Sequence, residues 1–443
     1  MRGCGGSDTD FLNRNKHGLL LPFLMMSVSL GNSALTGSDL ILRVGVESDI
    51  LHGPMTGIGN YCFRLLQTLV ASNDDLIVWG FTGLSWRKLE ADLFQRLEIA
   101  HQKQFSEYDS SSWTSNSTAS AKLAIREKLQ NTEVARRLYR TVRARCFNRR
   151  LPKTPFFLFH AFRYLPPAAL PVPILPVVYD LSFERYPGFH PLDRRRQLAG
   201  LARAISNAPL VQTISEFSKA EIVELYGCPI DKIIVAPPAP AEIFEPLGAQ
   251  ITCAGLSSLD LHYKQYFLAV GTLEPRKNLR TLIAAYSNLS AAHRAHFPLI
   301  IVGNAGWGDL ALPPESARLI QRGELRFLNR IKDVQLRHLY EGANALLFPS
   351  IYEGFGMPII EALACGTRVA HSKDSSMDEI TNGLAIRAPA LDCAAWTEIM
   401  RSFADDPEGS WSKAEERIAR ARQYTWRNSA EIVREAYVRI MTG

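Results

Sequence analysis

The second half of the sequence alternates short apolar runs with helix-like segments, and this alternation constrains the fold more than any other feature. Strand-like runs lie at 266–270, 297–302, 325–328, 345–348 and 367–370. Helix-like segments lie between them at 279–286, 334–341 and 358–365. Strands that alternate with helices form parallel sheets with helices on both faces. The pattern therefore predicts a doubly wound α/β domain.

The first half shows the same alternation less regularly. Strand-like runs lie at 40–46, 76–81, 156–160, 174–179, 210–214 and 231–235. Between 84 and 150 the sequence is typical of helices and loops, so no strand is expected there. Ser215 suits the N-cap of a helix over 216–226. The proline-rich stretch 236–240 then breaks the pattern.

A chain of 443 residues is too long for one ordinary core, which supports two domains. We expect a leader at 1–40 and two Rossmann-like domains, at 41–245 and 246–427. A C-terminal helix at 428–443 is expected to return to the first domain. Two such domains joined by a hinge predict a central cleft, and ligands bind at the carboxyl ends of parallel strands.

Composition is that of a soluble globular protein, with 47% apolar and 21% charged residues. A net charge of +6 gives no general signal for nucleic-acid binding. The seven cysteines are scattered and include no C-x-x-C pair. This arrangement argues against a disulfide framework or a zinc site, and it favours a reducing compartment.

The N-terminal apolar run at 18–30 is too short for a transmembrane helix. It resembles the apolar part of a signal peptide, with Ser33-Ala34 as a weak cleavage site. The other reading is a disordered or misassigned leader, with Met25 or Met26 as the true start. We favour this second reading, because the motifs below need a cytosolic substrate.

The stretch from Arg136 to Arg150 contains seven arginines, and 134–150 contains no acidic residue. One reading is a solvated helix face. The other is a surface that meets anionic lipid or a pyrophosphate-linked acceptor. The sequence does not decide between them.

Residues 348–366 carry the most chemical information. Glu353 is expected in a loop after a buried strand, and Gly354 and Gly356 let backbone N–H groups approach a ligand closely. The helix that follows presents its N-terminus to an anionic group. Glu361 is expected about one turn into that helix, so both carboxylates can face one pocket.

A second group of candidate binding residues lies at 271–278. Arg276 offers a bidentate fork and Lys277 a point charge, and both stand just before a helix. This placement suits a diphosphate. Gly57 and Gly59 form a G-x-G loop, which is weak as a dinucleotide fingerprint because the third glycine is missing.

Together these segments resemble retaining glycosyltransferases of family 4, which have the GT-B fold, over roughly residues 42–440. The segment around Glu353 and Glu361 resembles the family's Glu-x7-Glu motif, and Gly271–Asn278 resembles its diphosphate-binding loop. The resemblance implies that Glu361 binds the nucleotide ribose. It implies that Glu353, with Gly354, Phe355 and Gly356, binds the transferred hexose. Arg276 and Lys277, across the same cleft, would stabilise the departing diphosphate, with Gly271 in their loop.

In the first domain, Gly57 and Gly59 resemble the glycine loop that faces the reacting sugar. Asp180 and Ser215 lie in two further segments similar to the family's. The stretch 178–191 is similar to mannosyltransferase-like and rhamnosyltransferase-like members that build bacterial surface polysaccharides. One position departs from the family's pattern. Tyr179 stands where many members carry a histidine implicated in contact with the donor sugar. His160 or His190 could take over that contact.

The resemblance implies transfer of a hexose, mannose from GDP-mannose, to a growing polysaccharide such as lipopolysaccharide or to a lipid-linked glycan. It implies no cofactor and no metal, because the basic pair can do a cation's work. A cytoplasmic location is expected, with contact to the inner face of the plasma membrane through Arg136–Arg150 left open. Two alternatives remain: a nucleotide-sugar epimerase of the same fold, or a non-catalytic protein that binds sugar nucleotides.

Overall fold

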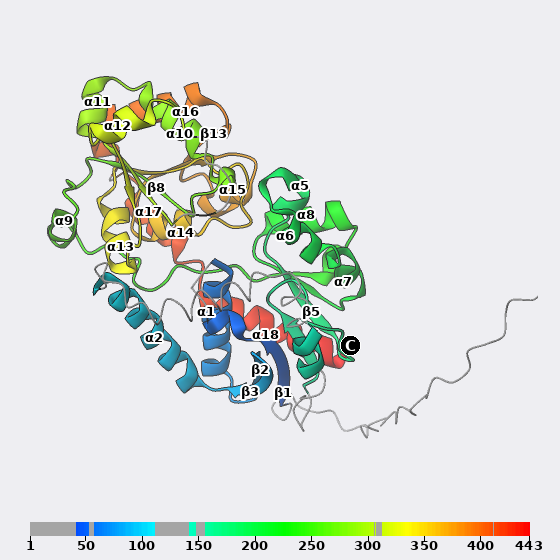
Figure 1. The fold of residues 1–443 in the computed structure, drawn as a ribbon. Helices are drawn as coiled ribbons and strands as arrows, with labels where there is room; N and C mark the ends of the chain where they lie inside the picture. The colour runs from blue at the N-terminus through cyan, green and yellow to red at the C-terminus, as the bar shows by residue number, and fades with distance from the viewer. Residues whose placement is uncertain are drawn as a thin grey trace, which may run out of the picture. The chain divides into compact units, whose positions relative to one another are not determined.

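The computed structural model describes residues 41–52, 57–110, 141–147, 156–304, 306, 312–410 and 412–443. Two sheets organise these residues, and helices pack on them (Figure 1). The predicted α/β class with two Rossmann-like domains is confirmed. The expected leader at 1–40 lies outside the described residues.

The first sheet has seven strands in the order β3-β2-β1-β4-β5-β6-β7. Their bounds are β1 (Leu42–Glu47), β2 (Leu76–Thr82), β3 (Ser85–Leu89), β4 (Leu158–Ala161), β5 (Ile174–Val178), β6 (Val211–Thr213) and β7 (Ile233–Val235). All neighbours pair in parallel except β2 and β3, which are antiparallel.

Strand β3 corrects the expectation that 84–150 holds only helices and loops. Its sequence, Ser-Trp-Arg-Lys-Leu, has no apolar run, and Arg87 and Lys88 are exposed. An edge strand pairs with a neighbouring strand on one side only, and it need not bury both of its faces. A polar segment can therefore form it. The expected strand at 231–235 is shorter than predicted, because Ile230–Lys232 form a 3-10 turn before β7.

The second sheet has six parallel strands in the order β10-β9-β8-β11-β12-β13. Their bounds are β8 (Phe267–Val270), β9 (Leu299–Val302), β10 (Leu325–Leu328), β11 (Ala345–Phe348), β12 (Val369–Ser372) and β13 (Ile386–Ala388). The strand order reverses between β8 and β11. The loops after these two strands are therefore neighbours, and a reversal of this kind is where doubly wound sheets bind ligands.

Helices cover both faces of the second sheet (Figure 1). On one side lie α10 (Leu279–Ser287), α12 (Ser316–Gln321) and α16 (Cys393–Asp405); on the other lie α13 (Asp333–Gly342), α14 (Met357–Ala364) and α17 (Ala414–Ala421). The core under α10 and α16 includes Phe267, Leu282, Leu347 and Trp396, all fully buried. This core fixes the carboxyl ends of β8 and β11.

The helices of the first sheet include α1 (Gly57–Ser72), α2 (Ala91–Ser110) and α8 (Glu216–Tyr226). The predicted N-cap is confirmed, since the Ser215 side chain accepts a hydrogen bond from Ser218 N. The last helix, α18 (Trp426–Thr442), reaches this sheet, where Tyr437 Oη lies 2.7 Å from Nδ1 of His160 in β4. The other α-helices within the described residues are α5 (Ser182–Arg185), α6 (Leu192–Leu198), α7 (Leu201–Asn207), α9 (Ala249–Ser257), α11 (Ala291–His296) and α15 (Ser376–Thr381).

Only residues 141–147 of the basic stretch lie within the described part of the chain. There Arg143 is largely buried and pairs with Glu47 at 2.7 Å and with Asp49 at 2.6 Å. Arg143 is therefore held by two carboxylates at the end of β1. In the described residues no helix is both long and apolar enough to cross a membrane.

Candidate active site

Three charged side chains meet at the reversal point of the second sheet. Arg276 and Lys277 lie in a 3-10 turn, Pro275–Lys277, after β8, and Glu353 lies in the loop after β11. Arg276 Nη1 is 2.8 Å from Glu353 Oε2, and Lys277 Nζ is 2.5 Å from Glu353 Oε1. Pairing of β8 with β11 brings these loops together, as the shared sheet edge predicts.

The cluster is buried and fully paired. The three side chains are 14%, 13% and 9% exposed for Arg276, Lys277 and Glu353. Arg276 Nη2 also donates to Glu274 Oε1 at 2.6 Å, and its Nη1 donates to the Tyr352 carbonyl at 2.6 Å. Burial acts to raise the pKa of Glu353, but Arg276 and Lys277 outweigh it and lower that pKa to about 2. Glu353 is therefore ionised throughout the physiological pH range.

This arrangement changes the roles expected for Glu353, Arg276 and Lys277. From the sequence, Glu353 and the two cations are expected on opposite sides of a cleft, whereas in the structure they form an ion cluster on one sheet. Glu353 is thus the counter-ion of Arg276 and Lys277, the two cations that suit a diphosphate. An anion that reaches Lys277 competes with this carboxylate.

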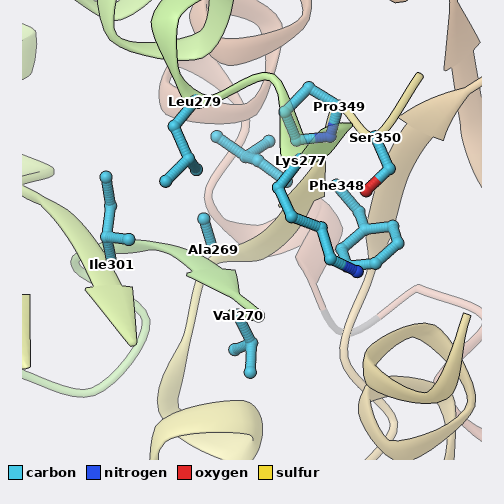
Figure 2. Close-up of a pocket in the computed structure, with 10 residues that line it drawn as sticks. Ala269, Val270, Lys277, Leu279, Ile301, Phe348, Pro349 and Ser350 are labelled. Carbon is cyan, nitrogen blue, oxygen red and sulfur yellow. The ribbon is translucent and has the colours of Figure 1, made fainter. Parts of the chain in front are cut away.

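A small pocket lies beneath Lys277 at the carboxyl ends of β8 and β11 (Figure 2). Gly271, Phe348 and Ser350 line it with the lysine, whose Nζ is 5.0 Å from the centre of the Phe348 ring. Gly271 has φ +152°, a conformation that favours glycine. The buried Ser350 hydroxyl has no hydrogen-bond partner among the described residues.

Two serines of the next loop hold the segment 353–355 in place. Ser375 Oγ accepts from Glu353 N at 3.0 Å, and Ser376 Oγ donates to the Phe355 carbonyl at 2.9 Å. The Phe355 ring packs edge-on against Tyr424 with ring centres 5.5 Å apart. The Phe355 side chain is therefore part of the core, and only its backbone can meet a substrate. Gly356, at φ +105°, then begins α14.

Gly354 is where the loops of the two sheets touch. A side chain here would collide with the Tyr179 carbonyl and would lie 2.8 Å from Asp180 Cβ, so only glycine fits. Ser215 Oγ donates to the Gly354 carbonyl at 2.7 Å and also caps α8. Ser215 is fully buried, and its hydroxyl positions Gly354.

Tyr179 belongs to a buried aromatic cluster. Its ring is buried against Tyr61 and Tyr164, with ring centres 5.5 and 5.6 Å apart. His160 is buried as well, and burial lowers its pKa to about 3, so it serves the core.

Asp180 and His190 follow β5 of the first sheet and are linked through the Ser182 hydroxyl. Ser182 Oγ donates to Asp180 Oδ1 at 2.8 Å and lies 3.0 Å from His190 Nε2. Burial is the main cause that lowers the pKa of His190, with the charge of Arg276 adding to it. The charge of Asp180 in turn acts on Arg276, so these groups share one electrostatic environment with the ion cluster.

Glu361 lies apart from that cluster, on α14. Tyr340 Oη donates to Glu361 Oε2 at 2.8 Å. Burial raises the pKa of Glu361 to about 8, against the effect of this hydrogen bond. The two glutamates of the motif therefore differ in charge at neutral pH. Sequence reasoning missed Tyr340, because nothing in the pattern of α13 sets it apart from a core residue.

Gly57 and Gly59 lie in the first turn of α1, not in the loop that was expected before it. Gly57 is exposed, with open space around its α-carbon, and Gly59 is buried. Residues 53–56, where that loop would lie, are outside the described part. Within the described residues no group of three or more His, Cys, Asp or Glu side chains could hold a metal ion.

The fold is that of GT-B glycosyltransferases, and the sequence matches show a glycosyltransferase. Residues 259–423 match the family model described as "Glycosyl transferases group 1", and this part of the chain is a domain of that family. The matched residues include Arg276, Lys277, Glu353 and Glu361.

Among curated relatives, the chain is 29% identical to the O-antigen chain mannosyltransferase B of Escherichia coli, over 89% of this chain and 99% of the relative. Two solved structures share the fold. Sucrose-phosphate synthase from Thermosynechococcus elongatus has a TM-score of 0.65 at 17% identity, over 90% of this chain and 99% of that one. Anabaena HepE in complex with UDP and glucose has a TM-score of 0.59 at 15% identity, over the same shares.

Proposed function

We propose that this protein is a retaining mannosyltransferase that moves mannose from GDP-mannose to a growing surface polysaccharide or lipid-linked glycan. The observation that carries the proposal is the buried cluster of Arg276, Lys277 and Glu353 at the reversal point of the second sheet. Similarity to a mannosyltransferase over almost the full length of both chains supports the sugar.

In the proposed reaction the donor's diphosphate takes the place of Glu353 beside Lys277 and Arg276. The negative charge on the departing diphosphate grows in the transition state, so these cations stabilise that state more than the ground state. The released Glu353 carboxylate then accepts hydrogen bonds from the hexose hydroxyls. The acceptor attacks from the face that the diphosphate leaves, and the leaving phosphate assists removal of the acceptor's proton.

A nucleotide-sugar epimerase is the competing function. It would convert the donor without any acceptor. A non-catalytic protein that binds sugar nucleotides is disfavoured by the presence of Arg276, Lys277, Glu353 and Glu361 together.

The proposal is tested by incubating the purified protein with GDP-mannose, UDP-glucose or a dTDP sugar, with and without manno-oligosaccharides, in the presence of a chelator. We expect GDP-mannose to raise the melting temperature most, because ligand binding stabilises the folded state by mass action. We expect GDP release only when an acceptor is present. Donor conversion without acceptor would support the epimerase, and loss of transfer with the chelator would contradict the proposed independence from metal.

Glu361 predicts a pH dependence of nucleotide binding. Its carboxyl is mostly protonated at pH 7, since its pKa is raised to about 8. If Glu361 accepts hydrogen bonds from the ribose hydroxyls, binding favours the ionised form. GDP affinity should therefore rise between pH 6 and pH 8, with uptake of a proton by the buffer. Calorimetry in buffers of different ionisation enthalpy measures this proton, and Glu361→Gln should abolish the effect. An affinity independent of pH in the wild-type protein would contradict the role.

We also propose a cytoplasmic enzyme that contacts the inner face of the plasma membrane through the basic stretch. Arg143 is excluded from this surface because it pairs with Glu47 and Asp49. Flotation with vesicles containing anionic lipid should weaken when Arg136, Arg137 and Arg140 are replaced by Gln. Arg143→Gln serves as the contrast, since it should lower stability without changing flotation. Unchanged flotation of the triple variant would overturn the membrane contact.

A further inference from the structure

A second pocket lies at the edge of the first sheet, outside the site described above. Its volume is about 240 Å³, and the β2–β3 hairpin and the start of α2 form its walls. Thr82, Ser85 and Arg87 line it from the hairpin, and Asp92 and Arg96 line it from α2.

One end of the pocket, formed by Thr82 and Ser85, lies at the carboxyl ends of the parallel strands, as Asp180 does; from there the pocket extends along antiparallel β3 toward Leu89. Thr82 ends β2 and Asp180 follows β5, and both strands belong to one parallel sheet in the order β2-β1-β4-β5. Three steps between neighbouring strands, at ~4.8 Å each, separate the two positions by about 14 Å. A chain-like ligand whose end lies at Asp180 can therefore run along this edge to the pocket.

The lining suits a neutral ligand rich in hydroxyl groups. Thr82 and Ser85 contribute hydroxyls, and Leu89 and Leu93 contribute apolar surface. The charged residues carry both signs, and two exposed pairs, Lys88–Glu90 at 3.6 Å and Arg96–Asp92 at 3.1 Å, are of the weak kind. Sugar hydroxyls both donate and accept hydrogen bonds, so they can bind cation and carboxylate alike. An anion would meet the two carboxylates.

Hydrogen bonds and an ion pair hold the wall of the pocket in place. The Thr82 and Ser48 hydroxyls lie 2.7 Å apart, and Gly83 N donates to Asp49 Oδ1 at 2.5 Å. Arg143 in turn holds Asp49. A preformed wall lowers the entropy cost of binding. Arg87 is exposed on this wall and makes no ion pair with another described residue. Its guanidinium can therefore donate hydrogen bonds to a ligand.

From these observations we propose that the pocket binds a sugar unit of the acceptor glycan, several units behind the end that reacts at Asp180 and the ion cluster. The inference rests on the proposed transferase function and adds a place for the body of the acceptor. It makes acceptor length, and not only the terminal sugar, a determinant of activity.

The test compares manno-oligosaccharides of two and six units, which carry a reducing-end label and no phosphate. In Arg87→Ala we expect kcat/KM for the hexasaccharide to fall about 10-fold through a higher KM, while the disaccharide changes less than about 2-fold. Asp92→Ala should show the same selectivity for length. Arg318→Ala, at an exposed position on α12, is the matched control and should change neither.

Calorimetric binding of the hexasaccharide separates this inference from the proposed function. Binding that depends on Arg87, without any transfer, would uphold the pocket and overturn the function. Transfer whose loss in Arg87→Ala is equal for both lengths, or absent for both, would overturn the pocket and leave the function standing.

Discussion

Replacing Lys277 with alanine is expected to lower kcat by roughly 10²–10³-fold, the range seen when one preorganised donor to a developing charge is removed. Lys277 is buried beside Glu353 and lines the pocket at the reversal point of the second sheet. A charge in such a site acts more strongly than one in water. Because the charge on the leaving diphosphate grows during the reaction, kcat should fall more than KM rises.

Two control variants sharpen this measurement. Lys277→Arg keeps the charge but changes its shape and should recover part of the rate. Lys277→Met keeps the length of the side chain and should resemble alanine. GDP release in the presence of acceptor gives the rate. A Lys277→Ala enzyme whose kcat stays within about 3-fold of the wild type would show that the leaving group is stabilised elsewhere.

Glu353→Ala is expected to lower the free energy of unfolding by about 3–5 kcal/mol, because it leaves Arg276 and Lys277 buried without their shared counter-ion. The sign of the pH effect follows from the lowered pKa of Glu353. The stabilisation is present above the ordinary carboxyl pKa of about 4.5 and is lost as pH falls toward 2. Denaturant unfolding at pH 7 measures the loss.

Adding GDP distinguishes a counter-ion role from simple packing. A diphosphate bound beside Lys277 would restore the missing negative charge, so GDP should raise the melting temperature of Glu353→Ala more than that of the wild type. Glu353→Gln keeps the shape and loses the charge, and it should behave like alanine in this comparison. An equal or smaller GDP effect in both variants would contradict competition between Glu353 and the diphosphate.

The alternation of strands and helices predicted both sheets, because buried parallel strands are short apolar runs that any core requires. This alternation does not predict strand β3, because its sequence is polar and it pairs with a neighbouring strand on one side only. The glycines at 57 and 59 were placed in a loop, yet they begin α1. Glycine favours a turn but does not exclude the first turn of a helix, where the backbone N–H groups need no partner within the helix.

The sequence predicts which residues form the candidate site, but it does not predict the contacts between their side chains. Arg276, Lys277 and Glu353 follow strands that the topology makes neighbours, so their meeting can be inferred from the strand order. That Glu353 pairs with both cations depends on side-chain distances that no pattern encodes. The bonds from Ser215 to Gly354 and from Tyr340 to Glu361 join residues 139 and 21 positions apart. Such contacts appear only when the sheets are packed.

Proton NMR of the reaction measures whether the protein transfers mannose to an acceptor with retention. GDP-mannose carries mannose in the α configuration. With a manno-oligosaccharide acceptor, we expect a new anomeric signal of an α-linked mannose that appears together with GDP and is absent in Lys277→Ala. A β-linked product, or a changed sugar nucleotide formed without acceptor, would overturn the proposed retaining transfer.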